Sequence, residues 1–365
     1  MATKKTPRPT ARRAKKTMKR ARPKAPAAAR GPVSLEQAKA IALARRGAAP
    51  AAKKAIASAS PGTVAAERRR LELRKRADLK ERIRLYEETY AVMQQRGVKS
   101  RAPAAKASIA KAAMGAPLRI MAEGDSWFDY PVLLRGGLIT RLEKSLGLPI
   151  LDSAEPGDEV RYMLGVKQRT KLEALFAHAN EQGRPWDVLL FSGGGNDIVG
   201  EPLCLWVRPW VAGTPPDALI DKPRFEAALG IVRAGYEDLI AMRDRLSPGT
   251  RLVFHAYDFA LPTGEGVCML GPWLAPSFDY RGYPKYPDFL VRAAVVKQML
   301  LQFAQMLAGF QTSHPANVTF IDAQGTLDTH PDWWDNELHP NSDGFDLFAA
   351  RFDRDLRGLY PGRFP

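Results

Sequence analysis

The sequence predicts an α/β protein, a three-layer α/β/α sandwich in which helices cover both faces of a mainly parallel sheet. After residue 117, apolar strand-like runs alternate with longer helix-like segments, a pattern typical of parallel sheets. The chain of 365 residues has a hydrophobic content of 45%, which is ample for the core of such a domain.

Each layer of the predicted sandwich corresponds to definite segments. The candidate strands, enough for a five-stranded flavodoxin-like sheet, are residues 118–123, 149–153, 187–192, 251–256 and 317–321. The candidate helices are residues 136–146, 167–182, 223–245, 287–310 and 342–357.

The N-terminal residues 1–65 have a different composition from the rest of the chain. They consist mainly of Ala, Lys, Arg and Pro, and much of the net charge of +16 lies before the first acidic residue, Glu36. Because this segment has scarcely any large apolar side chains, burial cannot offset the entropy of ordering it. We therefore expect a disordered basic arm.

The next segment, residues 66–97, predicts an amphipathic helix that stops at Gly97. Its apolar side chains are spaced 4-3-4-3, with charged residues between them. They are Leu79, Ile83, Tyr86, Tyr90 and Met93. We expect this stripe to pack on the α/β domain or on a second copy of the chain. Residues 98–116 are rich in Ala and Lys and indicate a linker, so the α/β domain spans 117–365.

Ser126 is the leading candidate for a nucleophile. It belongs to a Gly-Asp-Ser sequence that directly follows the apolar run around Ile120 and Met121. This position puts the hydroxyl at the carboxyl end of a strand, where open α/β sheets bind their ligands.

Two later segments supply the other groups that such a serine needs. The segment 192-SGGGNDIVG-200 contributes Asn196, and 338-LHPNSDGF-345 contributes His339. A serine hydroxyl is a poor nucleophile until a neighbouring base accepts its proton during the attack. His339 is the expected base.

Taken together, the motifs at 124–126, 194–197 and 338–341 resemble those of the SGNH (GDSL-type) hydrolase superfamily, over roughly residues 117–360. The resemblance implies an oxyanion hole formed by the backbone N–H groups of Ser126 and a glycine after the second strand, with the Asn196 amide. Gly157, in 152-DSAEPGDEV-160, has the appropriate position for that glycine.

The acidic member of the triad departs from the superfamily pattern. An Asp usually lies three residues before the histidine, and here that position is Asn336. A carboxylate at this place fixes the tautomer of the imidazole and stabilises its charged form. Asp335 is the predicted partner of His339. The alternatives are Asn336 as a neutral orienter, a carboxylate such as Glu337 or Asp332, or a backbone carbonyl.

Two long connections, 199–222 and 258–286, are expected to form a lid or pocket walls. They supply the candidate substrate-binding residues. On an alternative hypothesis, their aromatic side chains only anchor the loops to the core. These candidates are Leu203, Trp206, Trp210 and Trp273.

The sequence thus predicts a serine hydrolase that cleaves a carboxylic ester, small or glycan-linked, through an acyl-enzyme and without a cofactor. Thioesters are chemically equivalent targets. An acyltransferase that uses the same acyl-enzyme is one alternative, and a catalytically weak domain in a nucleic-acid-binding or scaffold protein is another. No metal site is expected, because the other histidines lack HExxH or paired spacing.

The basic arm and the cysteines bear on partners and location. Residues 1–65 could bind nucleic acid or another polyanion nonspecifically by releasing counterions, or could be a solvated tail. Cys204 and Cys268 lack CxxC spacing, which favours a reducing cytoplasm. No apolar run approaches the ~20 residues of a membrane span, and no apolar signal segment follows the basic start. The oligomeric state is left open.

Overall fold

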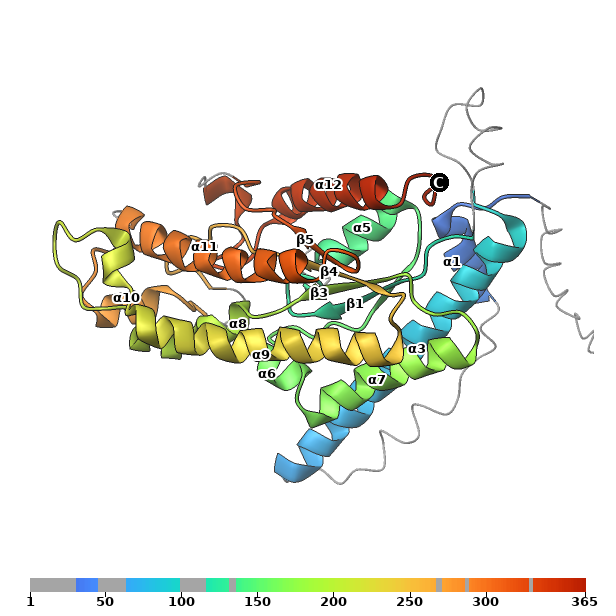
Figure 1. Cartoon of the computed structure of the whole chain (residues 1–365), viewed down its shortest axis with the longest axis horizontal. Coiled ribbons are helices and arrows are strands. Elements are labelled where there is room, and N and C mark those ends of the chain that lie inside the picture. The colour runs from blue at the N-terminus through green and yellow to red at the C-terminus, as the bar shows by residue number, and fades with distance from the viewer. Residues whose placement is uncertain are drawn as a thin grey trace, which may run out of the picture. The chain divides into compact units, whose positions relative to one another are not determined.

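A sheet of five parallel strands, in the order β2-β1-β3-β4-β5, forms the centre of the α/β domain (Figure 1). Every residue of β1 and β3 is buried, as expected for a parallel sheet with both faces covered. This confirms the predicted sheet. The strands are β1 (Ile120–Gly124), β2 (Ile150–Asp152), β3 (Val188–Ser192), β4 (Arg251–His255) and β5 (Val318–Ile321).

The structure, a computed structural model, describes residues 31–44, 64–98, 116–130, 136–266, 271–285, 289–327 and 331–365. The described residues from 32 to 365 belong to one unit. Most of the predicted arm and linker, residues 1–30, 45–63 and 99–115, lies outside the described residues.

Strand order fixes where a ligand can bind. β1 pairs with β2 on one side and with β3 on the other. The chain therefore continues toward one edge of the sheet after β1 and toward the other edge after β3. In open α/β sheets, the crevice for a ligand lies at the carboxyl ends of the strands where the order reverses in this way. Ser126, just after β1, and Asn196, just after β3, both follow strands at this crevice.

Helices cover both faces of the sheet and match all the predicted ones. Figure 1 shows α5 and α12 on one side of the sheet and α7 and α9 on the other. The five long helices of the domain are α5 (Leu138–Leu146), α7 (Val166–Glu181), α9 (Lys222–Leu246), α11 (Leu290–Ser313) and α12 (Ser342–Leu359).

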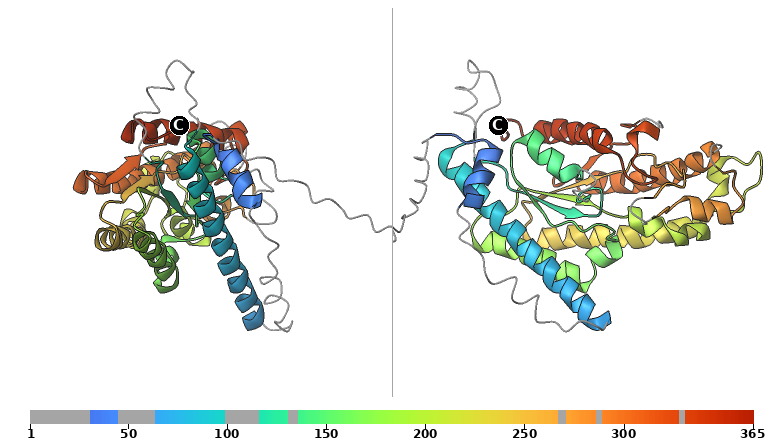
Figure 2. Two further views of the ribbon diagram at one scale, coloured as in Figure 1. Left: turned by 90° about the vertical axis from the view of Figure 1, so that its right-hand side faces the viewer. Right: turned by 180° about the vertical axis from the view of Figure 1, so that it is seen from behind.

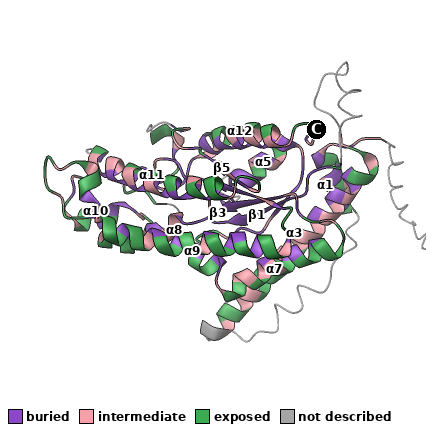
Figure 3. Ribbon diagram, in the orientation of Figure 1, coloured by how far each residue is buried: buried purple, intermediate pink, exposed green. Residues whose placement is uncertain are grey.

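Adjacent residues of β4 show how the two faces are packed. Phe254 contacts Tyr236 of α9 and Phe310 of α11, with ring centroids 4.8 and 6.1 Å away. His255, the next residue, points to the opposite face and contacts Phe352 of α12 at 5.4 Å. The buried residues of Figure 3 accordingly lie along the sheet and the inner sides of these helices.

By length and composition α11 could cross a membrane, and half of its most apolar window is buried inside the structure. It also contains Arg292, which is only 2% exposed and forms an ion pair with Asp279.

Shorter elements occur between the main strands and helices. They are α6 (Val160–Met163), α8 (Gly195–Ile198), α10 (Ala275–Tyr280), and the 3-10 helices η2 (Glu201–Leu205), η3 (Pro216–Leu219) and η4 (Pro331–Trp333). α8, η2, η3 and α10 lie in or beside the two long connections singled out in the sequence.

The amphipathic helix predicted for 66–97 is α3 (Val64–Arg96), and its apolar stripe packs on the chain's own domain. Tyr86, Tyr90 and Met93 are buried. The ring of Tyr86 lies 5.3 Å from that of Trp186, and the Tyr90 hydroxyl donates to the Pro117 carbonyl at 2.7 Å.

A buried arginine joins α3 to the start of β1. The Arg119 side chain is 3% exposed and forms an ion pair with Glu87 of α3 at 2.7 Å. Its guanidinium also lies over the ring of Trp186, 4.6 Å from the centroid. Cation–π stacking of this kind stabilises a desolvated arginine.

The prediction of disorder throughout residues 1–65 is wrong for residues 31–44. Helix α1 (Leu35–Ala44) lies in this range and packs against α3 (Figure 2). Ser34 and Gln37 form a capping box, in which each side chain accepts the backbone N–H of the other, at 3.3 and 3.1 Å. The cap, with Leu35 buried beneath it, gives order to a segment whose average composition predicts none.

Candidate active site

The turn that carries Ser126 is pressed against the end of β3. A Cβ at Gly124 would lie 2.8 Å from both the Cβ and the carbonyl oxygen of Ser192, so only glycine fits there. The Asp125 backbone N–H donates to the same carbonyl at 3.1 Å. The glycine of the GDS sequence is thus required by the close approach of two strands.

Asp125 holds the turn in place. One carboxylate oxygen accepts the Trp127 backbone N–H and the Ser192 hydroxyl, both at 3.0 Å. The other accepts the Tyr257 hydroxyl at 2.5 Å. Burial raises the pKa of Asp125 to about 6, although these hydrogen bonds act to lower it. All the contacts of this carboxylate serve the shape of the turn.

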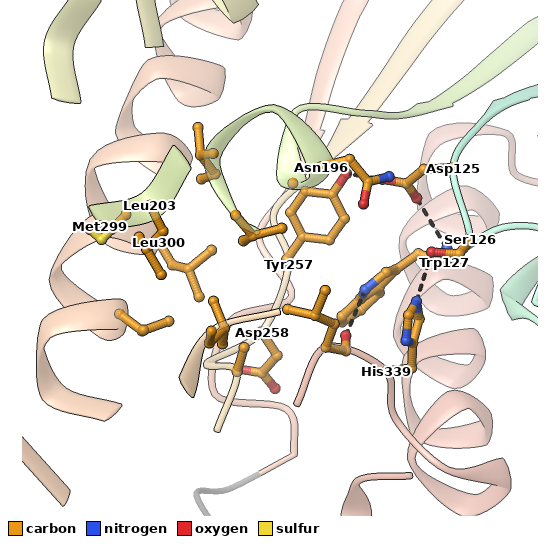
Figure 4. A pocket seen from close by; sticks show the side chains of 17 residues that line it. Asp125, Ser126, Trp127, Asn196, Leu203, Tyr257, Asp258, Met299, Leu300 and His339 are labelled. Carbon is orange, nitrogen blue, oxygen red and sulfur yellow. Dashed lines mark hydrogen bonds between the residues drawn. The ribbon is translucent and has the colours of Figure 1, made fainter. Parts of the chain in front are cut away.

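Ser126 and His339 are in hydrogen-bond contact. The serine Oγ lies 2.7 Å from the histidine Nε2, across 213 positions of sequence (Figure 4). The Trp127 indole N–H donates to the Leu338 carbonyl at 3.0 Å and thereby ties the two segments together. Both side chains of the pair are buried, with 9% of Ser126 and 6% of His339 exposed.

Asn336, and not Asp335, contacts the second ring nitrogen of His339. The Asn336 Oδ1 lies 3.0 Å from the imidazole Nδ1. The Asp335 carboxylate instead accepts the Tyr130 hydroxyl at 2.9 Å. The prediction of Asp335 as the direct partner is therefore corrected, and the neutral orienter considered beside it occupies the place.

Burial without an adjacent carboxylate affects the protonation of the histidine. Desolvation lowers the pKa of His339 to about 4. The imidazole is therefore neutral at ordinary pH. With Nδ1 donating to the Asn336 oxygen, Nε2 is the free base that faces Ser126.

Asn196 lies in α8, just beyond β3, and lines the same cavity as Ser126 and His339. Its amide nitrogen donates to the Asp158 carbonyl at 2.9 Å, which fixes the side chain beside the loop that follows β2. A side-chain amide has two N–H bonds, so a second one is left for an incoming oxygen.

Gly157 belongs to that same loop, with φ at +83°. The loop is joined to the end of β1 by the hydrogen bond from the Glu155 N–H to the Gly124 carbonyl at 2.9 Å. Gly157 and Asn196 line one groove together. Within the part of the chain that is described, the backbone N–H groups of Gly157 and Ser126 meet no acceptor. Their role as oxyanion donors stays a prediction.

A cavity of about 50 Å³ beside Ser126 has a mainly apolar lining. Leu203, a candidate substrate-binding residue, lines it, and Figure 4 shows Met299 and Leu300 of α11 nearby. The α11 residues were not foreseen, because nothing in an apolar helix marks the side that borders a cavity. The aliphatic side chains that line the cavity are those of Ile198, Val199, Leu203, Ala260, Leu274, Val296, Met299, Leu300 and Leu338.

A wider groove of about 940 Å³ also borders Asn196. The predicted residues Trp206 and Trp273 line it, and the ring of Trp273 lies edge-on to His339 at 5.8 Å. Trp210 instead packs against Tyr283, with ring centroids 5.4 Å apart, which matches the alternative reading of a loop anchor.

Glu337, another residue weighed as the acid, has a different task. Its buried carboxylate accepts four backbone N–H groups, from Gly264, Trp273, Leu274 and Ala275, at 2.6 to 3.0 Å. It thereby fastens the loop that carries Trp273 to the segment that carries His339.

Among the residues that the structure describes, there is no group of three or more His, Cys, Asp or Glu side chains able to hold a metal ion.

Fold and site together define an α/β protein with a serine–histidine pair at the carboxyl edge of its sheet. Neither a family model nor a curated protein matches the sequence. Similar solved structures include the lipase Lip_vut3 from a goat rumen metagenome, 14% identical, which covers 65% of this chain and 96% of its own, with a TM-score of 0.42. The aryl esterase of M. smegmatis is 15% identical, with coverages of 66% and 99% and a TM-score of 0.41.

A GDSL-like lipase from Parabacteroides merdae is 19% identical and covers 67% of this chain and 98% of its own, with a TM-score of 0.37. Its name is that of the family that the sequence motifs resemble. Because these identities are below 20% and the TM-scores below 0.5, the case for a reaction rests on the residues of the site.

Proposed function

We propose that the protein is a serine hydrolase that cleaves carboxylic esters through an acyl-enzyme on Ser126. The observation that carries the proposal is the 2.7 Å contact between the serine Oγ and the His339 Nε2, buried at the ligand-binding edge of the sheet.

In the first half of the reaction, the Ser126 oxygen attacks the ester carbonyl while its proton passes to Nε2 of His339. The bond between the carbonyl carbon and the alcohol oxygen then breaks, and the same proton leaves with the alcohol. In the second half, water gives its proton to Nε2 and attacks the acyl-enzyme, which restores the serine and releases the acid.

The negative oxygen of each tetrahedral intermediate needs hydrogen-bond donors. We assign this role to the backbone N–H groups of Ser126 and Gly157 and to the second amide N–H of Asn196. Each donor of this kind contributes about 2.7–4 kcal/mol to the transition state.

The two hollows beside Ser126 fit the two halves of an ester. The apolar cavity suits the acyl chain, and its small volume of about 50 Å³ favours a short chain. The open groove suits the alcohol half. Its exposed Leu205 and Ile231, beside Trp206, favour an alcohol with an apolar part.

The experiment that tests the proposal measures hydrolysis of p-nitrophenyl esters with acyl chains of two to twelve carbons. Wild type and Ser126→Ala are compared at equal folded concentration, and both are treated with a fluorophosphonate, which attaches covalently to activated serines. We expect activity and labelling in the wild type, with both lost in Ser126→Ala, and an optimum at short chains.

A tryptic map of the labelled protein locates the modified residue. Modification of Ser126 supports the proposal. Labelling at another serine, or turnover that survives in Ser126→Ala, would overturn it. A matched control is Ser277→Ala, which removes a buried hydroxyl that donates to the Gly200 carbonyl at 3.1 Å.

A further inference from the structure

Four side chains form an unbroken hydrogen-bonded series that starts at the histidine. The His339 Nδ1 contacts the Asn336 Oδ1 at 3.0 Å, the Asn336 Nδ2 donates to the Tyr130 hydroxyl at 3.0 Å, and that hydroxyl donates to the Asp335 Oδ2 at 2.9 Å. The Tyr130 ring also stacks on the imidazole, with centroids 4.5 Å apart.

The direction of this series is fixed by the main chain. The Asn336 Oδ1 accepts the backbone N–H groups of Leu338 at 3.0 Å and His339 at 3.1 Å. Backbone N–H groups can only donate, so the atom that faces them is the amide oxygen and the nitrogen faces Tyr130. Every donor in the series therefore points from the histidine toward the carboxylate.

We propose that Asp335 is the carboxylate that supports His339, acting at a distance through Tyr130 and Asn336 as positioning residues. The proposal rests on the serine hydrolase function proposed above. When His339 takes the Ser126 proton, the charge on the ring strengthens the bond from Nδ1–H to the amide oxygen. The aligned amide and hydroxyl dipoles transmit the influence of the carboxylate, since hydrogen bonds in a series polarise one another. No proton moves beyond Nδ1.

The arrangement explains how an asparagine can replace the usual aspartate in this position. In serine proteases, replacing the triad aspartate by asparagine lowers kcat about 10⁴-fold because the histidine adopts the wrong tautomer. Here the amide presents its oxygen to Nδ1, which selects the productive tautomer, and the carboxylate is retained one hydroxyl further along.

The test compares Tyr130→Phe, Asp335→Asn and the double variant with wild type. Each single change interrupts the series at one hydroxyl or one charge, so we expect kcat to fall roughly 3- to 10-fold with KM unchanged, the size of one hydrogen bond. Because the residues act as one series, the double variant should be no slower than the slower single variant.

Tyr90→Phe is the matched control, because it removes another buried tyrosine hydroxyl bond, to the Pro117 carbonyl, far from the histidine in the chain. A second readout is the proton resonance of the His339 Nδ1–H, which should shift in Tyr130→Phe and not in Tyr90→Phe. This signal does not depend on the thermal stability of the variants.

The outcomes separate the two proposals. An active wild type with unchanged kcat and Nδ1–H resonance in Tyr130→Phe overturns the relay and leaves the serine hydrolase intact. Multiplying losses in the double variant also overturn it. A wild type that neither turns over esters nor reacts with the fluorophosphonate overturns the hydrolase, and the relay with it.

Discussion

At the scale of single residues, we expect the neutral partner of His339 to set the pH dependence of the proposed reaction. A carboxylate beside Nδ1 stabilises the charged imidazolium and raises its pKa, whereas the Asn336 oxygen carries no full charge. Burial lowers the pKa of His339 to about 4. The other carboxyl groups near His339 belong to Asp125 and Asp258, which line the cavity, and to Asp335 and Glu337, which flank Asn336 in sequence.

We therefore expect the acid limb of kcat/KM near pH 4, well below the ordinary histidine value of about 6.5. Asn336→Asp should move this limb to higher pH, because a carboxylate would then contact the ring. The measurement is kcat/KM for a p-nitrophenyl ester between pH 3.5 and 8. A wild-type limb at 6.5, or no movement in N336D, would contradict the expectation.

Unfolding has to be followed in parallel, because the same histidine links stability to pH. Between about pH 6.5 and 4 the unfolded chain binds a proton that the buried, neutral His339 does not. Its contribution to the free energy of unfolding is complete above 6.5 and declines as the pH falls through this window. Activity measured at constant folded fraction separates the two effects.

Ser126 and Asn196 could be found from the sequence because each lies in a motif just after an apolar run, and His339 because it lies in the late motif 338–341. Asn336 could not be preferred over its acidic neighbours, because the sequence does not show which of three consecutive polar side chains points toward the imidazole. Tyr130 gave no signal at all, because its contact with Asp335 joins positions 205 apart.

At the scale of elements, α11 presents different environments on successive residues. Leu300 is 6% exposed and borders the apolar cavity, whereas Leu301 is 39% exposed on the outside of the same helix. The two positions have the same side chain and helical context, so they form a natural pair for testing what the cavity holds.

Leu300→Phe should shorten the preferred acyl chain by about one to two carbons, because the larger ring fills space that the chain would take, while Leu301→Phe should leave the preference unchanged. The measurement is kcat/KM across the p-nitrophenyl ester series. The assignment of the cavity to the acyl chain fails if both variants keep the wild-type optimum. Overpacking costs about 1–3 kcal/mol of stability, so folding is checked first.

The regular elements of the domain were predictable because parallel strands buried on both faces have continuous apolar sequences, as in 188-VLLF-191. Helix α1 was missed because the composition of residues 1–65 as a whole masks a local signal. The Ser34–Gln37 capping box is a sequence pattern, and it gives helical order to the ten residues that follow.

At the scale of the whole molecule, the attachment of α3 to the α/β domain depends on a buried charge. Arg119 reaches from the start of β1 to Glu87 and lies beneath the rings of Tyr86, Tyr90 and Trp186. Arg84, on the same helix, forms ion pairs with Glu81 and Glu88 and is 32% exposed.

Arg119→Ala should lower the free energy of unfolding by about 2 kcal/mol, because it removes a buried guanidinium that stacks on three aromatic rings and pairs with Glu87, whose partly exposed partner Arg184 remains. Arg84→Ala removes exposed pairs and should cost less than about 1 kcal/mol. Urea unfolding followed by tryptophan fluorescence measures both. Equal losses in the two variants would show that the buried ion pair does not hold α3 in place.

The four hydrogen bonds to Glu337 join the loop that carries Trp273, which lines the site, to the segment that carries His339. If the loop that carries Trp273 moved outward to admit a substrate, it would break those bonds or carry the His339 segment with it. Breaking the bonds costs free energy. Moving the segment separates His339 from Ser126. If the protein is the proposed hydrolase, we therefore expect substrate to enter and leave through the groove beside Asn196 without movement of the Trp273 loop.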